Sequence, residues 1–193
     1  METHSSHKIV ILAAPSGAGK TTIMARMMEW MPDQLSFSVS STTRAPREGE
    51  RDGVDYFFIS EEQFKNNIEA DGFLEWEMVY NGQYYGTTKK EMERIWNLNK
   101  VPLLDIDVYG AMKVKSIYGS QVLSIFIQPP SLQTLRERLI QRGKDSMENI
   151  EKRLAKAAEE IAQKIHFDTI VVNDDLNKAC ENVHKAVVEF LKN

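Results

Sequence analysis

A glycine-rich segment near the N-terminus constrains the fold more than any other feature of this sequence. It runs from Ala14 to Thr21 and reads A-P-S-G-A-G-K-T. The preceding run from Ile9 to Ala13 is apolar and rich in β-branched residues, which is typical of a strand buried on both faces. A helical pattern begins at Lys20. This order of strand, loop and helix is the context that gives the phosphate-binding pattern G-x-x-x-x-G-K-[ST] its meaning.

The residues of this loop suit the binding of a nucleoside triphosphate. Gly17 and Gly19 let the backbone curl so that its N–H groups point at phosphate oxygens, and the helix N-terminus adds its positive dipole end. Lys20 is expected to bridge the β- and γ-phosphates, and Thr21 to offer its hydroxyl to Mg²⁺. Ala14 replaces the first glycine of the pattern, at a position expected to be extended. The predicted ATP-binding segment comprises Ala14, Pro15, Ser16, Gly17, Ala18, Gly19, Lys20, Thr21 and Thr22.

The rest of the chain alternates between strand and helix patterns. Further buried-strand candidates lie at residues 101–104, 122–127 and 169–172, with helical patterns between them. Such alternation predicts βαβ units and a parallel sheet. Residues 36–97 have shorter strands, alternating polarity and more turns, so we interpret them as an insertion with a small sheet of its own.

The length, net charge and composition of the chain argue against some classes of protein. The chain has 193 residues, which suits one domain, and its net charge of −4 argues against nonspecific nucleic-acid binding. Residues 1–8 are polar and unlike a signal peptide, and no apolar run approaches the length of a membrane span. The only cysteine is Cys180, which fits a reducing compartment. We therefore expect a cytoplasmic protein with neither nucleic-acid nor membrane partners.

The segment from Ser38 to Arg47 indicates a second anionic ligand. Arg44 and Arg47 are three residues apart, with Pro46 stiffening the loop between them. Two fixed guanidinium groups suit one phosphate monoester through bidentate contacts. Farther along, tyrosine hydroxyls can donate to phosphate, and Glu75 can accept two parallel N–H bonds.

Several motifs together resemble those of guanylate kinases. They follow the same order along residues 8–190 and are Ser38–Arg47, Gly49-Glu50, Asp55-Tyr56, Glu75, Tyr84-Tyr85-Gly86-Thr87, Asp105-Ile106-Asp107, Arg142-Gly143, Lys152-Arg153-Leu154 and Val172-Asn173-Asp174-Asp175. The resemblance implies a three-layer α/β P-loop fold with a central parallel sheet, an α+β GMP-binding insertion and a helical lid. It also implies Mg²⁺-dependent transfer of the γ-phosphate of ATP to GMP.

The resemblance assigns roles at both substrates. The GMP phosphate would be held by Arg44, Arg47, Tyr56 and Tyr85, and guanine would be read by Ser40, Glu75, Thr87 and Asp107. Asp105 would lie near Mg²⁺, which it and Thr21 would hold through water. Lid residues over ATP would be Arg138, Arg142 and Arg153, and Asn173 would lie near the adenine. The residues expected to act in the transfer itself are Lys20, Arg44, Arg142 and Arg153.

The resemblance also divides the single domain. We expect a core of about residues 8–35, 98–135 and 166–193, a GMP-binding region of about 36–97 and a lid of about 136–165. ATP and GMP are the expected small-molecule partners, and a homodimer remains open.

Structural interpretations compete with these roles. Arg44 and Arg47 could form surface ion pairs, Asp105 and Asp107 could cap the turn after a strand, and Arg142 and Arg153 could belong to a solvated helix face. Two other functions also remain open. One is a kinase of another phosphate ester, such as a ribose bisphosphate, and the other is a non-catalytic phosphopeptide-binding module. The complete guanine-reading set argues against the first, and Lys20 with Thr21 argues against the second.

Overall fold

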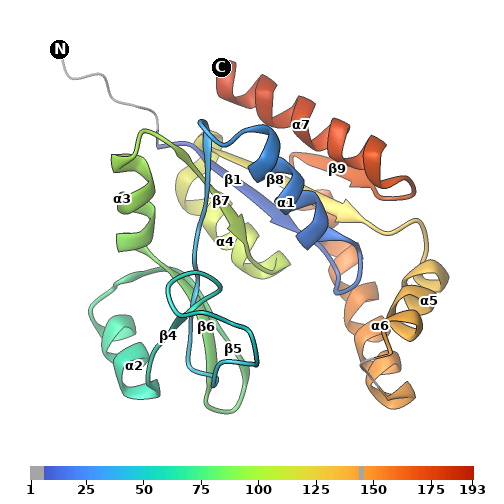
Figure 1. Cartoon of the computed structure of the whole chain (residues 1–193), viewed down its shortest axis with the longest axis horizontal. Helices are drawn as coiled ribbons and strands as arrows, with labels where there is room; N and C mark the ends of the chain where they lie inside the picture. The colour runs from blue at the N-terminus through green and yellow to red at the C-terminus, as the bar shows by residue number, and fades with distance from the viewer. Residues whose placement is uncertain (1–6, 144–145) are drawn as a thin grey trace.

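The computed structural model describes residues 7–143 and 146–193 and has a five-stranded parallel sheet at its centre (Figure 1). The strand order is β2-β7-β1-β8-β9, and the bounds are Leu35–Phe37, Val101–Asp105, Ile9–Ala13, Val122–Gln128 and Thr169–Val172. All five residues of β1 are buried, as expected for the central strand of such a sheet. The four strands predicted from apolar runs are confirmed.

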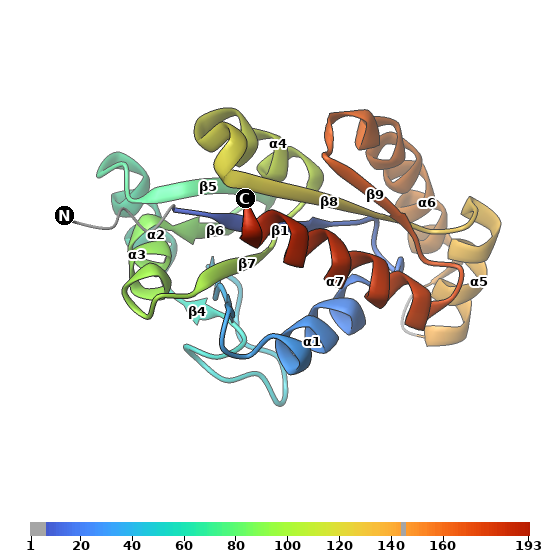
Figure 2. The same ribbon diagram turned by 90° about the horizontal axis from the view of Figure 1, so that it is seen from above.

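Helices cover both faces of this sheet, which confirms the three-layer architecture. Alternate residues of β1 point to opposite faces. Val10 and Leu12 pack with α1 (Lys20–Trp30) and α7 (Leu176–Lys192). Ile9 and Ile11 pack with α4 (Val108–Tyr118) and with Met92 of α3 (Lys89–Asn97). Figure 2 shows α4 on one side of the strands and α1 with α7 on the other.

The insertion contains a second sheet with the order β4-β3-β6-β5. Its strands are Phe57–Phe58, Ser41–Thr42, Gln83–Thr88 and Phe73–Tyr80, and α2 (Glu61–Glu69) lies between β4 and β5 in the sequence. Strand β2 pairs with β7 of the central sheet through Ser36 and Phe37. The expected boundary between residues 35 and 36 therefore cuts through a core strand, and the core sheet extends to Phe37.

Two helices, α5 (Leu132–Arg142) and α6 (Met147–Ala162), occupy the region of about residues 136–165 that is expected to form a lid, and α5 begins four residues before it. Leu135 and Leu139 of α5 pack against Ile150 and Ala157 of α6. Short 3₁₀ helices at Gly119–Gln121 and Gln163–His166 complete the chain. Residues 1–6 of the polar N-terminal segment and 144–145 of the lid lie outside the described residues. None of the described helices has both the length and the apolar character needed to cross a bilayer.

Candidate functional site

A cavity of about 760 Å³ lies between the phosphate loop, the carboxyl ends of the central strands, the insertion and the lid helices. Ligands of parallel α/β sheets bind at this edge. Most of the predicted site residues line it: Ala14, Pro15, Ser16, Gly17, Gly19, Lys20, Thr21, Thr22, Ser40, Tyr56, Glu75, Tyr85, Asp105, Asp107, Arg142 and Arg153. Segments far apart in the sequence thus converge on one cavity.

The phosphate loop requires glycine at two positions. Gly17 and Gly19 have φ angles of 94° and 96°, in the left-handed region that glycine favours. A β-carbon on Gly19 would lie 2.3 Å from Asn173 Nδ2, so packing excludes a side chain there as well. Among the described non-glycine residues, only Asp71 and Asn99 have positive φ, so Ala14 needs none of glycine's freedom.

Asn173 contacts the backbone of the phosphate loop and stabilises it. Its side chain is buried, and Nδ2 donates a hydrogen bond of 2.7 Å to the carbonyl oxygen of Ala18. The backbone carbonyl oxygen of Asn173 accepts a hydrogen bond of 3.0 Å from Arg138 Nη2. Asn173, Arg138 and the buried Ala18 are predicted ATP-binding residues that do not line the cavity. The contacts observed for Asn173 and Arg138 hold the loop and α5 in place, and contact with adenine stays a prediction.

Charged groups meet beside the loop. Lys20 Nζ forms an ion pair with Asp105 Oδ1 and donates to the carbonyl of Ile106 at 3.3 Å. Arg153 reaches the loop from α6, where Nη1 donates to Ser16 Oγ at 2.8 Å. Thr21, which carries a hydroxyl, and Asp105 both line the cavity. Mg²⁺ usually takes one or two protein oxygens and completes its shell with water and phosphate, so this donor pair fits that ion.

On the acceptor side, Arg44 forms a bidentate ion pair. Its Nη1 and Nη2 donate to the two carboxylate oxygens of Glu50 at 2.6 and 2.7 Å. Nε donates to the Tyr85 hydroxyl at 3.1 Å, and the guanidinium lies 4.9 Å from the centre of the Tyr56 ring. The ion pair raises the pKa of Arg44 and lowers that of Glu50 to about 2. Burial, followed by the nearby Asp105 charge, raises the pKa of Tyr56.

Arg47 is exposed and does not line the cavity. Its backbone N–H donates to Glu50 Oε2 at 2.8 Å, so it helps to hold the carboxylate that engages Arg44. Arg44 does form an ion pair, but its side chain is only 10% exposed, so the pair is not a surface one, and it coexists with Arg44's place beside Tyr56 and Tyr85. Contact of either arginine with a phosphate stays a prediction.

Three of the predicted base-reading residues, Ser40, Glu75 and Asp107, line the cavity, and Thr87, which does not line it, contacts Glu75. Glu75 is only 6% exposed, and its Oε1 accepts the Thr87 backbone N–H at 2.8 Å. Burial raises its pKa, while contacts with Thr87 oppose that rise. Asp107 Oδ1 caps α4 by accepting the Gly110 N–H at 2.7 Å, as the capping interpretation expects. Asp107 also lines the cavity, so capping leaves it accessible from there, and its role in base reading stays a prediction.

Three charged residues of the cavity wall were not predicted, namely Glu77, Lys156 and Glu160. Glu77 lies two residues after Glu75 on β5, so strand alternation places both on one face. Lys156 and Glu160 follow Arg153 on α6 at spacings of three and seven, so helical periodicity aligns all three. Periodicity was therefore the signal that could have identified them. Val79, Gly86 and Ile106 complete the lining.

Comparisons with known proteins agree with this geometry. The family model described as guanylate kinase matches residues 6–190. Guanylate kinase from Porphyromonas gingivalis is 47% identical over 95% of this chain and 98% of its own length. The enzyme from Salinibacter ruber is 49% identical, over 95% and 96%. The crystal structure of guanylate kinase from Anaplasma phagocytophilum is 30% identical, with a TM-score of 0.73 over 94% of this chain and 85% of that one.

Proposed function

The chain belongs to the guanylate kinase family and transfers the γ-phosphate of ATP to GMP, and from this premise we propose which residues carry the reaction. The products are ADP and GDP, and the reaction belongs to purine nucleotide metabolism. Relatives named guanylate kinase over nearly the whole chain set aside both a ribose bisphosphate kinase and a phosphopeptide-binding module. The proposed division of the domain into a core, a GMP-binding region and a lid is the one expected from the sequence, except that the core sheet extends to Phe37.

The phosphate loop holds ATP in this proposal. Residues 14–22 surround the triphosphate with backbone N–H groups, and Lys20 contacts the β- and γ-phosphates. Thr21 and Asp105 hold Mg²⁺, Asp105 through water, and the bound ion supplies positive charge to the phosphate oxygens. The ion pair of Lys20 with Asp105 supports this arrangement because it places both groups at one edge of the cavity. Arg138 and Asn173 stay proposed ATP-site residues, acting through the loop they support.

The GMP phosphate is bound by Arg44 and Arg47 with the hydroxyls of Tyr56 and Tyr85. Arg44 already contacts Tyr85 and lies over Tyr56, so three of these groups are assembled. The Glu50 carboxylate accepts from both Nη1 and Nη2 of Arg44, so a phosphate that binds these two nitrogens must replace the carboxylate. Exchange of one anion for another avoids leaving Arg44 without a counter-charge at either stage.

Guanine is read by Ser40, Glu75, Thr87 and Asp107, and the single observation that carries this assignment is the buried Glu75 carboxylate. Its Oε1 is oriented by the Thr87 N–H, and the residue lines the cavity. Guanine presents N1–H and the 2-amine side by side, a donor pair that matches one carboxylate. Adenine has an acceptor at N1 and no 2-amine, so AMP would leave the carboxylate buried and unpaired.

The protein supplies charge and position, and it supplies no nucleophile. An oxygen of the GMP phosphate forms the new bond to the γ-phosphorus, and the bond from that phosphorus to the β,γ-bridging oxygen breaks to release ADP. Lys20, Arg142 and Arg153 stabilise the charge of the transferring group, and Arg44 orients the acceptor phosphate. The contact of Arg153 with Ser16 supports the approach of the lid to the loop.

The test is a comparison of kcat/KM for GMP and AMP in the wild type, Glu75→Ala and Glu75→Gln. We expect wild type to prefer GMP by roughly 10⁴-fold, as for sites that require a substrate hydrogen bond. Glu75→Ala should lose most of this preference, and Glu75→Gln, which keeps the shape but not two acceptors, should lose much of it. Gln63→Ala, in the exposed capping box of α2, is the control variant. A Glu75→Ala enzyme that keeps its preference contradicts the assignment.

Two finer statements complete the proposal. We propose a reducing, cytoplasmic location, which the one cysteine supports because its thiol is free and buried. Formation of a homodimer stays a prediction, and sedimentation of the purified chain tests it.

A further inference from the structure

One buried carboxylate links the two segments through which the chain crosses between the core and the insertion. The chain leaves the core sheet after Phe37 and enters the insertion at β3, which begins at Ser41. It returns at Thr88, the last residue of β6 and the N-cap of α3. Glu91 of α3 accepts the Val39 backbone N–H through Oε1 at 3.0 Å. The outgoing and the returning segment are therefore bonded to each other.

The Glu91 carboxylate is held firmly from the side of the core. Glu91 is only 3% exposed, and Arg94 Nε donates to its Oε2 at 2.7 Å while Nη2 donates to Oε1 at 2.8 Å. A buried charge is tolerated when it is paired and hydrogen-bonded in this way. Helix α3 packs against β7 (Figure 1), and Met92 and Trp96 join the hydrophobic cluster on that face of the central sheet. Glu91 thus extends a rigid core helix to the outgoing segment.

Ser40 lies at the end of the segment that Glu91 holds. The Ser38 N–H donates to a carbonyl of β7 at 3.0 Å, so the core fixes the start of this segment. The Ser40 carbonyl accepts an N–H of β4 at 2.9 Å, so the insertion fixes its end. Glu91 holds the Val39 N–H between these two anchors. Because Ser40 lines the cavity, a shift of this short segment displaces a side chain of the site.

We propose that Glu91 is a positioning residue for Ser40, which by holding the Val39 N–H places the Ser40 hydroxyl to donate a hydrogen bond to O6 of guanine. This inference rests on the proposed function, because it takes Ser40 as a guanine reader. Among the three base-reading residues that line the cavity, Ser40 alone offers a hydroxyl donor, whereas Glu75 and Asp107 offer carboxylates. Glu91 does not line the cavity and acts on the base only through the backbone of Val39 and Ser40.

The proposal makes Glu91 matter for one atom of the substrate. 6-Thioguanosine 5′-monophosphate shares the phosphate, ribose, N1–H and 2-amine of GMP but carries sulfur, a weak acceptor, in place of O6. The ratio of GMP affinity to the affinity for this analogue therefore isolates the hydrogen bond to O6. A purely structural loss at Glu91 would weaken both ligands together and leave the ratio unchanged.

The experiment measures dissociation constants of both nucleotides by calorimetry for wild type and for variants of Glu91. Glu91→Ala leaves the Val39 N–H without its acceptor, and Glu91→Asp withdraws the carboxylate from it by one methylene. Each should lower the affinity ratio by about fivefold, the typical effect of one lost hydrogen bond. Glu91→Gln keeps an acceptor oxygen for the Val39 N–H and should keep the ratio within about twofold of wild type.

Two further variants are controls. Ser60→Ala removes the hydroxyl that caps α2 by accepting the Gln63 N–H at 3.1 Å, so it destabilises the insertion without touching Val39, and its ratio should match that of wild type. Ser40→Ala deletes the proposed donor itself and should lower the ratio about as much as Glu91→Ala. Because Glu91 acts on the acceptor side, its variants should bind ATP within about twofold of wild type.

The possible failures are distinguishable. An unchanged ratio in Glu91→Ala and Glu91→Asp, or an equal loss in Glu91→Gln, overturns the proposal. If Glu91→Ala does not fold, the comparison of Glu91→Asp with Glu91→Gln decides, and equal ratios in these two variants overturn it. A loss in Ser40→Ala with none in the Glu91 variants refutes only the role of Glu91. An unchanged ratio in Ser40→Ala refutes Ser40 as the reader of O6, and the role of Glu91 with it.

Discussion

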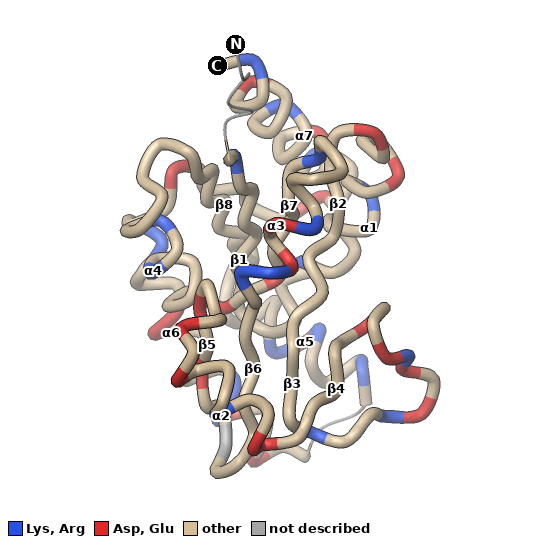
Figure 3. The backbone as a smooth tube through the Cα atoms, turned by 90° about the vertical axis from the view of Figure 1, so that its left-hand side faces the viewer, with Lys and Arg blue, Asp and Glu red and all other residues tan. Residues whose placement is uncertain are grey.

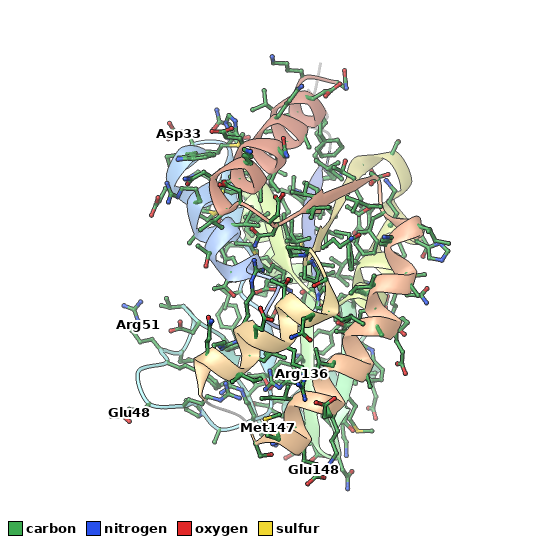
Figure 4. All side chains as sticks on the ribbon, turned by 90° about the vertical axis from the view of Figure 1, so that its right-hand side faces the viewer. Asp33, Glu48, Arg51, Arg136, Met147 and Glu148 are labelled. Carbon is green, nitrogen blue, oxygen red and sulfur yellow. The ribbon has the colours of Figure 1, made fainter. Side chains whose placement is uncertain are left out.

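The phosphate loop and the loop between β3 and β4 would both bind phosphate, but they are built differently. Residues 14–21 contain one charged side chain, Lys20, and their shape is fixed by Gly17, Gly19 and the buried Asn173 below them. Residues 43–56 carry acidic and basic side chains in turn, as Figure 3 shows along this loop. Glu48 and Arg51 project outward from it (Figure 4). One loop thus relies on backbone geometry and the other on charge pairs.

The two loops differ in how far their contacts must rearrange when a phosphate binds. The backbone of the phosphate loop is held in its curled shape by Gly17, Gly19 and the Asn173 contact without any phosphate present, so we expect its N–H groups to change little on binding. Arg44 instead binds Glu50 at 2.6 and 2.7 Å, and its fork becomes free for phosphate only when this pair breaks. The donor side is therefore organised in advance, while the acceptor side exchanges partners. The ion pair holds Arg44 and Glu50 together, and the backbone N–H of Arg47 adds a hydrogen bond to the same carboxylate.

The largest expected effect is on the organised side. Lys20→Ala removes the positive charge that we place at the transferring phosphate, and kcat should fall by about 10²–10³-fold, as for other removed charge-stabilising donors. The unfolding midpoint should change little because Lys20 is partly exposed. Steady-state kinetics with circular dichroism measure both quantities. The control is Lys65→Ala, which removes an ion-paired lysine of α2 outside the cavity. A kcat above about one tenth of wild type would contradict the assignment.

An intermediate effect is expected where the loop is held from below. Asn173→Ala removes the 2.7 Å bond to the Ala18 carbonyl, and loss of a buried partner typically lowers the free energy of unfolding by about 1–3 kcal/mol. KM for the phosphoryl donor should rise because the loop loses its support. If Asn173 acts through the loop, ATP and GTP weaken by the same factor as donors. If it contacts adenine, ATP alone weakens, and this result would restore the expectation from the sequence.

The parts of the molecule that follow from local patterns were predictable. The buried strand 9–13 and the phosphate loop after it require only neighbouring residues, and they are confirmed by the structure. The short strand β2 was missed because three residues, Leu35–Phe37, carry too little periodicity for recognition. Its place at the edge of the central sheet depends on pairing with β7, which is distant in the sequence.

The side-chain partners were less predictable than the residues themselves. Arg44 was identified, but its bidentate pair with Glu50 depends on the path of the loop between them. Asn173 was identified, but its contact with Ala18 spans 155 residues of sequence. Glu77 was overlooked although it repeats the spacing of Glu75 on β5, because an acidic residue is most often solvated. The functional residue types could be identified from the sequence, whereas contacts between residues far apart along the chain could not.

The smallest expected effect concerns the exchanging side and is a dependence of stability on pH. Arg44, and next the backbone N–H of Arg47, lower the pKa of Glu50 to about 2 from its ordinary value of 4.5. A carboxylate whose folded pKa is lowered stabilises the fold above pH 4.5, and this contribution disappears as pH falls toward 2. The free energy of unfolding should therefore be slightly higher in wild type than in Glu50→Gln at pH 7, and the difference should shrink below pH 4.5. Urea unfolding at several pH values measures this difference in the free energy of unfolding.

Saturating GMP at pH 7 should shrink the difference between wild type and Glu50→Gln, because the phosphate then takes the place of Glu50 on Arg44. A difference that GMP leaves unchanged would show that Arg44 keeps its carboxylate partner, and the two loops would then be equally fixed.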